Sequence, residues 1–239
     1  MATNNKASAE IFDLGNNVWR IVEKNTVNIY LVVGSAKAML IDTGYGKIDL
    51  LGIVSNITTL PLIVVNTHAH PDHSGGNDAF GAIHAHKGDF EGIRHYSSRH
   101  GFSLEALNDN DSVDLGNREI EIVHAPGHTA GSICLYDKAH KFLFTADTCN
   151  RMTWLFLDVC VGFPAYYQSL LRLRKYIDDD LVICPGHNEE AGKKLLEDCV
   201  ECARKILAGE KGVPYTYRPG KGLEVTHESV TIVYDPDTL

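Results

Sequence analysis

Residues 61–77 read PLIVVNTHAHPDHSGGN, and this stretch joins an apolar segment to a concentration of metal-ligand side chains. A short apolar run that ends at turn residues predicts a buried strand over residues 61–67. The turn that follows holds three histidines and one aspartate within six positions: His68, His70, Asp72 and His73. The stretch therefore predicts a strand that carries a metal-binding turn at its end.

The spacing inside the turn favours two metal ions. In an extended segment, residues two apart point to the same side, so His68 and His70 can bind one ion together. Pro71 then bends the chain, and Asp72 and His73 can face a second ion. The two glycines that follow the turn let the backbone leave it without steric cost.

Composition limits the classes of protein and partner. The 239 residues are enough for one large domain or two small ones, and 44% hydrophobic with 22% charged residues is a globular balance that excludes wholesale disorder. The net charge of −9 argues against nucleic acid or an anionic membrane as the partner. The absence of a run of about 18 apolar residues predicts no transmembrane helix. Because residues 1–17 lack an apolar segment, we expect no secretory signal.

Six cysteines are scattered through apolar segments, which predicts reduced, mostly buried thiols and a cytoplasmic protein. Cys199 and Cys202 form a C-x-x-C pair inside a predicted helix, without a second pair, so we interpret them as structural. The expected partner is a small-molecule substrate. The sequence leaves the oligomeric state open, with a homodimer among the alternatives.

Strand and helix patterns alternate along the whole chain, which predicts one α/β domain over residues 1–239. Helices are expected at 47–57, 165–177 and 189–208, a helix with a loop at 87–112, and a hairpin at 222–235. Strands are expected at 18–24, 27–34, 37–44, 61–67, 81–86, 118–127, 132–137, 141–147 and 180–186.

Four of these strands end in a histidine or an aspartate, in NTHAHPDH, HAPGHTAGS, ADT and PGHNEE. Loops held by rigid strands are where functional side chains concentrate. If the four ends converge, they bring together His68, His70, Asp72, His73, His128, Asp147 and His187. Seven ligands exceed what one tetrahedral zinc ion takes, and they suit two metals that share a bridging carboxylate and a bridging hydroxide.

The motifs HAHPDH, PGHTAGS, TAD and PGH, in this order after LIDTG, resemble those of the metallo-β-lactamase-fold hydrolases over about residues 16–190. The resemblance implies an α/β fold, an αββα sandwich of two mixed β-sheets flanked by helices. It implies that one metal is held by His68, His70 and His128. It also implies that the other is held by Asp72, His73 and His187, with Asp147 bridging the two.

Two ions on these ligands would lower the pKa of a shared water from about 15.7 toward about 7 and polarise a carbonyl oxygen. The hydroxide would attack the carbonyl, and Asp72 would carry the proton toward the leaving group. The expected reaction is hydrolysis of an ester, thioester, lactone or amide. Imidazole-rich sites favour two Zn²⁺, although iron or manganese suits the same ligands.

Several members of the family are alternatives. A β-lactam hydrolase would lack the bridging Asp147, and a phosphodiesterase would need extra cations. A diiron redox enzyme or a non-enzymatic binding protein with the same ligands also stays open. Glyoxalase II-like thioesterases and lactonases share the whole ligand set. The glyoxalase II-like thioesterases usually carry a further helical domain. The lactonases usually place a Tyr shortly after the bridging Asp, whereas residues 148–150 of this chain are Thr-Cys-Asn.

An apolar run follows Asp147 by a few residues and includes Met152, Trp154 and Phe156. Such a run either packs in the core or forms an apolar wall for an acyl chain or an aromatic ring of the substrate. We expect at least one of the two aromatic residues to line the substrate pocket.

Overall fold

The computed structural model describes residues 9–24, 26–97, 101–217 and 220–239 of the chain. Residues 1–8, which begin the segment expected to lack a secretory signal, lie outside these ranges, as do residues 98–100 of the expected helix and loop. The chain divides into two compact units, Met1–Ile122 and Val123–Leu239. Among the described residues, no helix is both long and apolar enough to cross a membrane.

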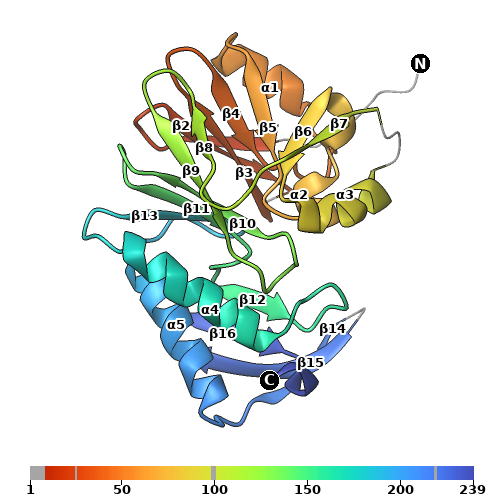
Figure 1. Cartoon of the computed structure of the whole chain (residues 1–239), viewed down its shortest axis with the longest axis vertical. Helices are drawn as coiled ribbons and strands as arrows, with labels where there is room; N and C mark the ends of the chain where they lie inside the picture. Colours follow the sequence, from red (N-terminus) through yellow and green to blue (C-terminus); the bar gives the residue numbers. More distant parts are fainter. Residues whose placement is uncertain (1–8, 25, 98–100, 218–219) are drawn as a thin grey trace. The chain divides into compact units, whose positions relative to one another are not determined.

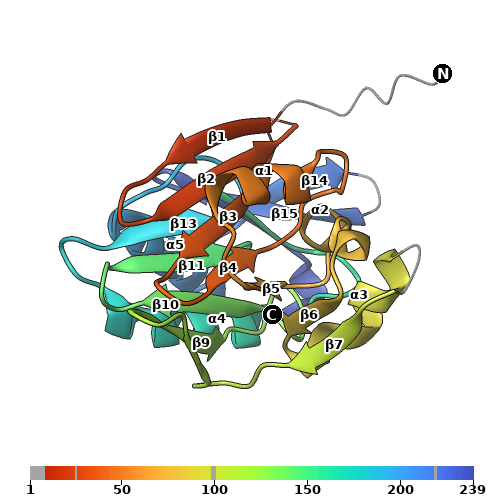
Figure 2. The same ribbon diagram turned by 90° about the horizontal axis from the view of Figure 1, so that it is seen from above.

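The first unit contains a mixed sheet with strand order β1-β2-β3-β4-β5-β6-β7 among the described residues (Figures 1 and 2). Strands β1 to β4 pair antiparallel, whereas β4 to β7 pair parallel. The strands are β1 (Ala9–Asp13), β2 (Val18–Glu23), β3 (Val27–Val33), β4 (Ala38–Ile41), β5 (Leu62–Val65), β6 (Ala82–Ala85) and β7 (Ser103–Ala106). The near-continuous burial of β3 and β4 explains why their sequences are almost entirely apolar, without alternation.

Short helices connect the parallel strands of the first unit. They are α1 (Leu50–Ile57), α2 (Pro71–Ser74), η1 (Asn77–Ala79), η2 (Lys87–Asp89) and α3 (Phe90–Tyr96). The parallel strands β4 and β5 are joined through α1, and β5 and β6 through α2 and η1. Because β4 and β5 are parallel neighbours, their carboxyl ends meet at one edge of the sheet, where LIDTG ends and the histidine turn begins.

A second sheet has the order β13-β11-β10-β9-β8 within the described residues. Its strands are β8 (Ser112–Asp114), β9 (Glu119–His124), β10 (Ile133–Asp137), β11 (Phe142–Ala146) and β13 (Val182–Pro185). Strands β11 and β13 run parallel, and Ala146 is in register with Pro185. Their carboxyl ends are therefore adjacent, which places the next residues of both strands side by side.

The second unit holds a sheet with the order β12-β16-β15-β14 in the part of the chain that the structure describes. The strands are β12 (Met152–Leu155), β14 (Val213–Tyr217), β15 (Gly220–His227) and β16 (Val230–Tyr234), followed by η4 (Pro236–Thr238). One face of this sheet packs on the helices α4 (Phe163–Leu173) and α5 (Lys194–Leu207), which lie side by side in Figure 1; a turn, η3 (Arg174–Tyr176), follows α4.

The predicted element types are confirmed for the buried strands, the three long helical segments and the hairpin β15–β16. Two strands, β7 and β8, replace part of the helix and loop expected at 87–112, and β1, β12 and β14 were not expected. Helix α5 begins five residues later than predicted, because Ala191 forms a bridge with Ile183 of β13 instead of a helical turn.

The two glycines after the histidine turn are needed for close backbone contact and not for unusual dihedral angles. Gly75 and Gly76 have φ of −66° and −91°. A Cβ on Gly75 would lie 2.4 Å from the carbonyl oxygen of Pro71, and one on Gly76 would lie 2.3 Å from that of Thr43. The sequence predicted that these glycines let the backbone leave the turn without steric cost. The structure gives a different reason, which is the close contact between α2 and the segment after β4.

We expect Gly76→Ala to lower the free energy of unfolding by about 1–3 kcal/mol, since overpacking against a backbone carbonyl costs that much. Gly81→Ala is the matched control, because its Cβ would have no atom within 4 Å, and we expect a change within about 0.5 kcal/mol. Urea unfolding of both variants measures the difference. Equal effects of the two substitutions would contradict the proposed contact.

Candidate metal centre

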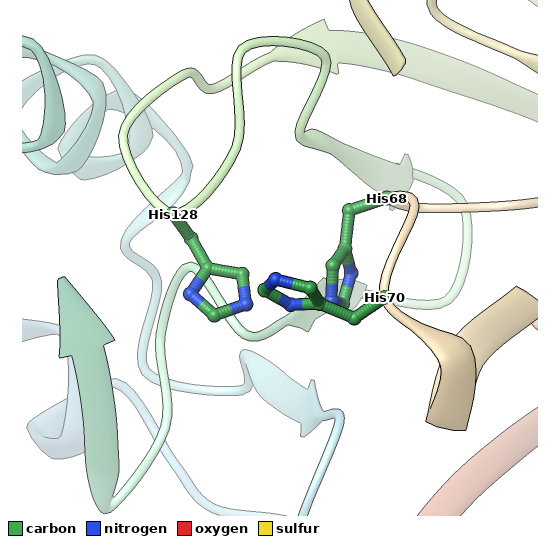
Figure 3. Close-up of side chains that lie close together, drawn as sticks. All are labelled: His68, His70 and His128. Carbon is green, nitrogen blue, oxygen red and sulfur yellow. The ribbon is translucent and has the colours of Figure 1, made fainter. Parts of the chain in front are cut away.

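The first set of ligands lies in the turn between β5 and α2. Strand β5 ends at Val65, and the backbone of His70 adopts φ −58° and ψ 147° before Pro71 begins α2. Proline is favoured at the first position of a helix, where no intrahelical N–H is needed. The imidazole rings of His68 and His70 meet edge to face, with centroids 4.9 Å apart (Figure 3).

The first set continues into helix α2. The His73 ring is tilted against that of His68 at 4.3 Å, and its Nε2 lies 3.8 Å from Asp72 Oδ2. Three imidazoles and one carboxylate thus share a small volume. His68 and His73 are fully buried, whereas the Asp72 side chain is 21% exposed.

The Asp42 carboxylate orients two of these imidazoles. Its Oδ2 lies 2.8 Å from His73 Nδ1, and it accepts hydrogen bonds from the Thr67 backbone N–H at 2.7 Å and from the Thr67 hydroxyl at 2.8 Å. Since a carboxylate accepts, the proton of neutral His73 is on Nδ1 and its Nε2 carries a lone pair. The Thr67 hydroxyl donates its proton to Asp42, so at 3.1 Å it accepts a hydrogen bond from His68 Nδ1. The lone pair of neutral His68 is then on Nε2, where it could bind a metal ion.

Other buried side chains that sequence reasoning missed hold the backbone of the turn. Asp89 Oδ2 accepts from the N–H of Ala69 at 2.8 Å, and the Ser74 hydroxyl donates to the Ala69 carbonyl at 2.8 Å. Asn77 donates to the side chain of Asn66 at 2.6 Å. These contacts join residues 5 to 20 apart, and no local motif signals them.

The second set of ligands lies within the second unit, at the ends of β11 and β13. Asp147 directly follows β11, and His187 follows β13 by one residue. The parallel register places them together, and Gly186 N–H donates to the Ala146 carbonyl at 2.9 Å. His187 Nε2 lies 3.4 Å from Asp147 Oδ2.

His128 completes the second set. Its Nδ1 donates to the carbonyl of Trp154 at 2.8 Å, because a carbonyl only accepts. Its Nε2 lies 3.4 Å from Asp147 Oδ2. The turn around it is closed by Ser132, whose hydroxyl accepts from the Thr129 N–H at 3.0 Å, which accounts for the serine of PGHTAGS.

The donors of this second set fit a metal ion. The tautomer of neutral His128 points the Nε2 lone pair at the carboxylate oxygen, and two such electron pairs repel unless a cation lies between them. Two donors on a tetrahedral ion with bonds of about 2.1 Å are about 3.4 Å apart, the distance observed from Asp147 Oδ2 to both His128 and His187. Nitrogen and carboxylate donors of this kind suit zinc and also iron or manganese.

Cys134, Cys149, Cys199 and Cys202 belong to the core of the second unit and not to either ligand set. Cys199 and Cys202 are fully buried on α5, and Cys149 Sγ lies 3.5 Å from Cys199 Sγ. Burial raises the pKa of Cys202 to about 12, so its thiol stays neutral at physiological pH. The structural interpretation of the C-x-x-C pair agrees with this environment.

The comparisons with known proteins identify the family. The family model described as the metallo-beta-lactamase superfamily matches residues 22–187. The chain is 32% identical over 232 residues to the acyl-coenzyme A thioesterase MBLAC2 of Bos taurus, with 77% of this chain and 82% of that protein covered. It is 28% identical over 205 residues to a hydroxyacylglutathione hydrolase of Bdellovibrio bacteriovorus, with 82% of this chain and 73% of that protein covered.

A solved structure has a similar fold. The metallo-beta-lactamase from Pontibacter korlensis matches with a TM-score of 0.68 at 19% identity, covering 82% of this chain and 99% of that chain. The protein therefore has the metallo-β-lactamase fold, and the predicted α/β fold class, an αββα sandwich, is confirmed. The chain belongs to the metallo-β-lactamase superfamily.

Proposed function

We propose that this protein is a dinuclear metal-dependent hydrolase that cleaves the carbonyl–sulfur bond of acyl thioesters. The observation that carries the proposal is the composition of the two ligand sets. The first unit contributes His68, His70, Asp72 and His73, and the second contributes His128, Asp147 and His187. Five imidazoles and two carboxylates exceed the four donors that one tetrahedral zinc ion takes. A set of this composition suits two ions that share a carboxylate.

Thioesters are favoured over esters and lactones by the relatives. The bovine protein is named for the hydrolysis of acyl-coenzyme A and the bacterial one for that of hydroxyacylglutathione, and both compounds are thioesters. We assign two Zn²⁺ to the centre, with iron and manganese as the alternatives for the same donors. A cytoplasmic location is supported by the six free cysteines, five of which are buried.

Bound metals would lower the pKa of an attacking water toward about 7 and polarise the thioester carbonyl. The chain itself supplies orientation and proton transfer. Asp42 and the Trp154 carbonyl fix the tautomers of His73 and His128, and therefore the direction of their lone pairs. Asp72 is a carboxylate that is 21% exposed beside His73, so it can take a proton from water and pass it to the departing thiolate.

The test of the function is a metal-resolved substrate panel on the full chain. We expect about two ions per chain, hydrolysis of acyl-coenzyme A and other acyl thioesters above that of aryl esters and lactones, loss of turnover on chelation, and its return with Zn²⁺. Elemental analysis and a thiol-release assay measure both quantities. Fewer than about 0.3 ions per chain would overturn the dinuclear centre, and faster turnover of lactones would overturn the substrate class.

Replacing Asp72 separates proton transfer from the fold. We expect Asp72→Asn to lower kcat by about 10²-fold or more, the usual contribution of a general acid or base, and to weaken the second metal. Asp198→Asn is a matched control, because Asp198 is a buried carboxylate on α5 that pairs with Lys194 and contacts neither ligand set. Its kcat should be unchanged. Near-normal turnover of the Asp72 variant would remove this residue from the mechanism.

The apolar run after Asp147 forms strand β12 and the start of the next turn. Trp154 is half-buried, and its ring lies 4.7 Å from that of Tyr217 and 5.5 Å from that of Phe156. Met152 is 43% exposed, whereas Phe156 is 6% exposed and lies against Gly220 and Gly222. We therefore propose that Trp154 and Met152 form an apolar wall for the acyl chain, with Phe156 supporting the wall from the sheet.

Truncating the two aromatic residues should have different effects. Each methylene removed from contact is worth about 0.8 kcal/mol, so Trp154→Ala should reduce kcat/KM for a decanoyl thioester about tenfold more than for an acetyl thioester. Phe156→Ala should lower stability by about 3–5 kcal/mol and affect both substrates equally. Thermal unfolding and kcat/KM for both thioesters measure the contrast. Equal losses on both substrates for the Trp154 variant would place the acyl chain elsewhere.

A further inference from the structure

A buried amide joins the two metal ligands that end neighbouring strands of the second unit. Asn150 is 1% exposed, and its Nδ2 donates to Asp147 Oδ1 at 2.8 Å. Its Oδ1 accepts from the backbone N–H of His187 at 3.3 Å. Only one orientation of the amide satisfies both contacts, because a carboxylate cannot donate and a backbone N–H cannot accept.

We infer that Asn150 is a positioning residue that sets which oxygen of Asp147 faces the metals. With Oδ1 held by the amide, Oδ2 is the oxygen that lies 3.4 Å from Nε2 of both His128 and His187. A carboxylate side chain has a broad, roughly two-fold torsion at its end, so without this contact Asp147 can turn and present either oxygen. This inference rests on the proposed metal centre.

A neutral donor is the suitable partner here. A lysine or arginine in the place of Asn150 would compete with the metals for the negative charge of Asp147. An amide holds the carboxylate by a hydrogen bond while it adds no charge, so the carboxylate keeps its attraction for cations. The same side chain also ties the loop after β13 to the loop after β11 through His187, so one residue fixes the relative positions of two ligands.

The backbone that carries Asn150 is anchored independently of the ligands. Thr148 N–H donates to the Thr145 carbonyl at 3.0 Å, and the Thr145 hydroxyl donates to the Cys149 carbonyl at 3.0 Å. Cys149 is fully buried, with its sulfur 3.5 Å from that of Cys199 on α5. The turn therefore keeps its place when the amide is removed, and the loss of the clamp can be measured by itself.

The experiment compares the full chain with its Asn150→Ala and Asn150→Ser variants. The serine hydroxyl is polar but one bond too short to reach both partners, so it serves if the alanine variant folds poorly. Thr148→Val is the matched control, since Thr148 is buried in the same turn and its hydroxyl contacts the Cys134 thiol, not a ligand. Chelator competition gives the affinities for Zn²⁺, the absorption spectrum with Co²⁺ reports ligand geometry, and unfolding of the metal-free proteins reports stability.

We expect both Asn150 variants to bind the more weakly held ion about 10- to 100-fold less tightly, as for other groups that orient metal ligands. The Co²⁺ spectrum should change, whereas Thr148→Val should retain the affinity and spectrum of the natural chain. Unchanged affinity and spectrum in the Asn150 variants, or an equal loss in Thr148→Val, would overturn the clamp. A natural chain that binds no metal would instead overturn the proposed function, so the two failures are distinguishable.

Discussion

The Asp42 carboxylate is the contact on which the first half of the ligand arrangement depends. Asp42 follows β4, and it accepts hydrogen bonds from His73 and from both donors of Thr67. It therefore joins the end of β4 to the histidine turn that follows the parallel strand β5. Asp42 has φ of +65°, a conformation that aspartate tolerates better than most residues. The strained backbone is held by hydrogen bonds on both carboxylate oxygens, and the result is a fixed direction for two imidazole lone pairs.

In the second unit, different groups orient the candidate ligands. The parallel register of β11 and β13 makes Asp147 and His187 neighbours, and a neutral amide and a backbone carbonyl complete the orientation. In both units the candidate ligands other than His128 follow the carboxyl ends of parallel strands, whereas His128 follows β9, which pairs antiparallel with β8. The reason is geometric, because adjacent parallel strands end at the same edge and their next side chains share one volume.

The strands that could be predicted from the sequence are those whose burial produces a run of apolar residues. Strand β4 is apolar throughout, and β3 and β11 are nearly so, because both faces of these strands are covered, and the types of these elements could be predicted. Strands β1 and β14 are edge strands with mostly exposed residues, and β14 contains Pro214, so neither carries a strong strand signal.

The candidate ligands could be named because they are concentrated in short motifs, and their assignment to two metals remains a prediction. The side chains that orient them could not be named in the same way. Asp89 and Asn150 act on residues that a linear pattern does not associate with them. Asn150 contacts His187 across 37 positions, and Asp89 contacts Ala69 across 20. Only the register of the parallel strands and the path of the loops bring such partners together.

The backbone and the side chain of Trp154 have different roles. Its backbone carbonyl fixes the tautomer of His128, and any amino acid at this position would offer the same carbonyl. Its ring belongs to an aromatic cluster with Tyr217 on the face of the sheet away from the helices. Thr153 and Leu155 are buried on the opposite face. Under the proposed function, a change of side chain at position 154 would therefore alter the surface offered to an acyl group while the candidate ligand His128 keeps its orientation. Substrate preference and metal binding would then be independent at this strand.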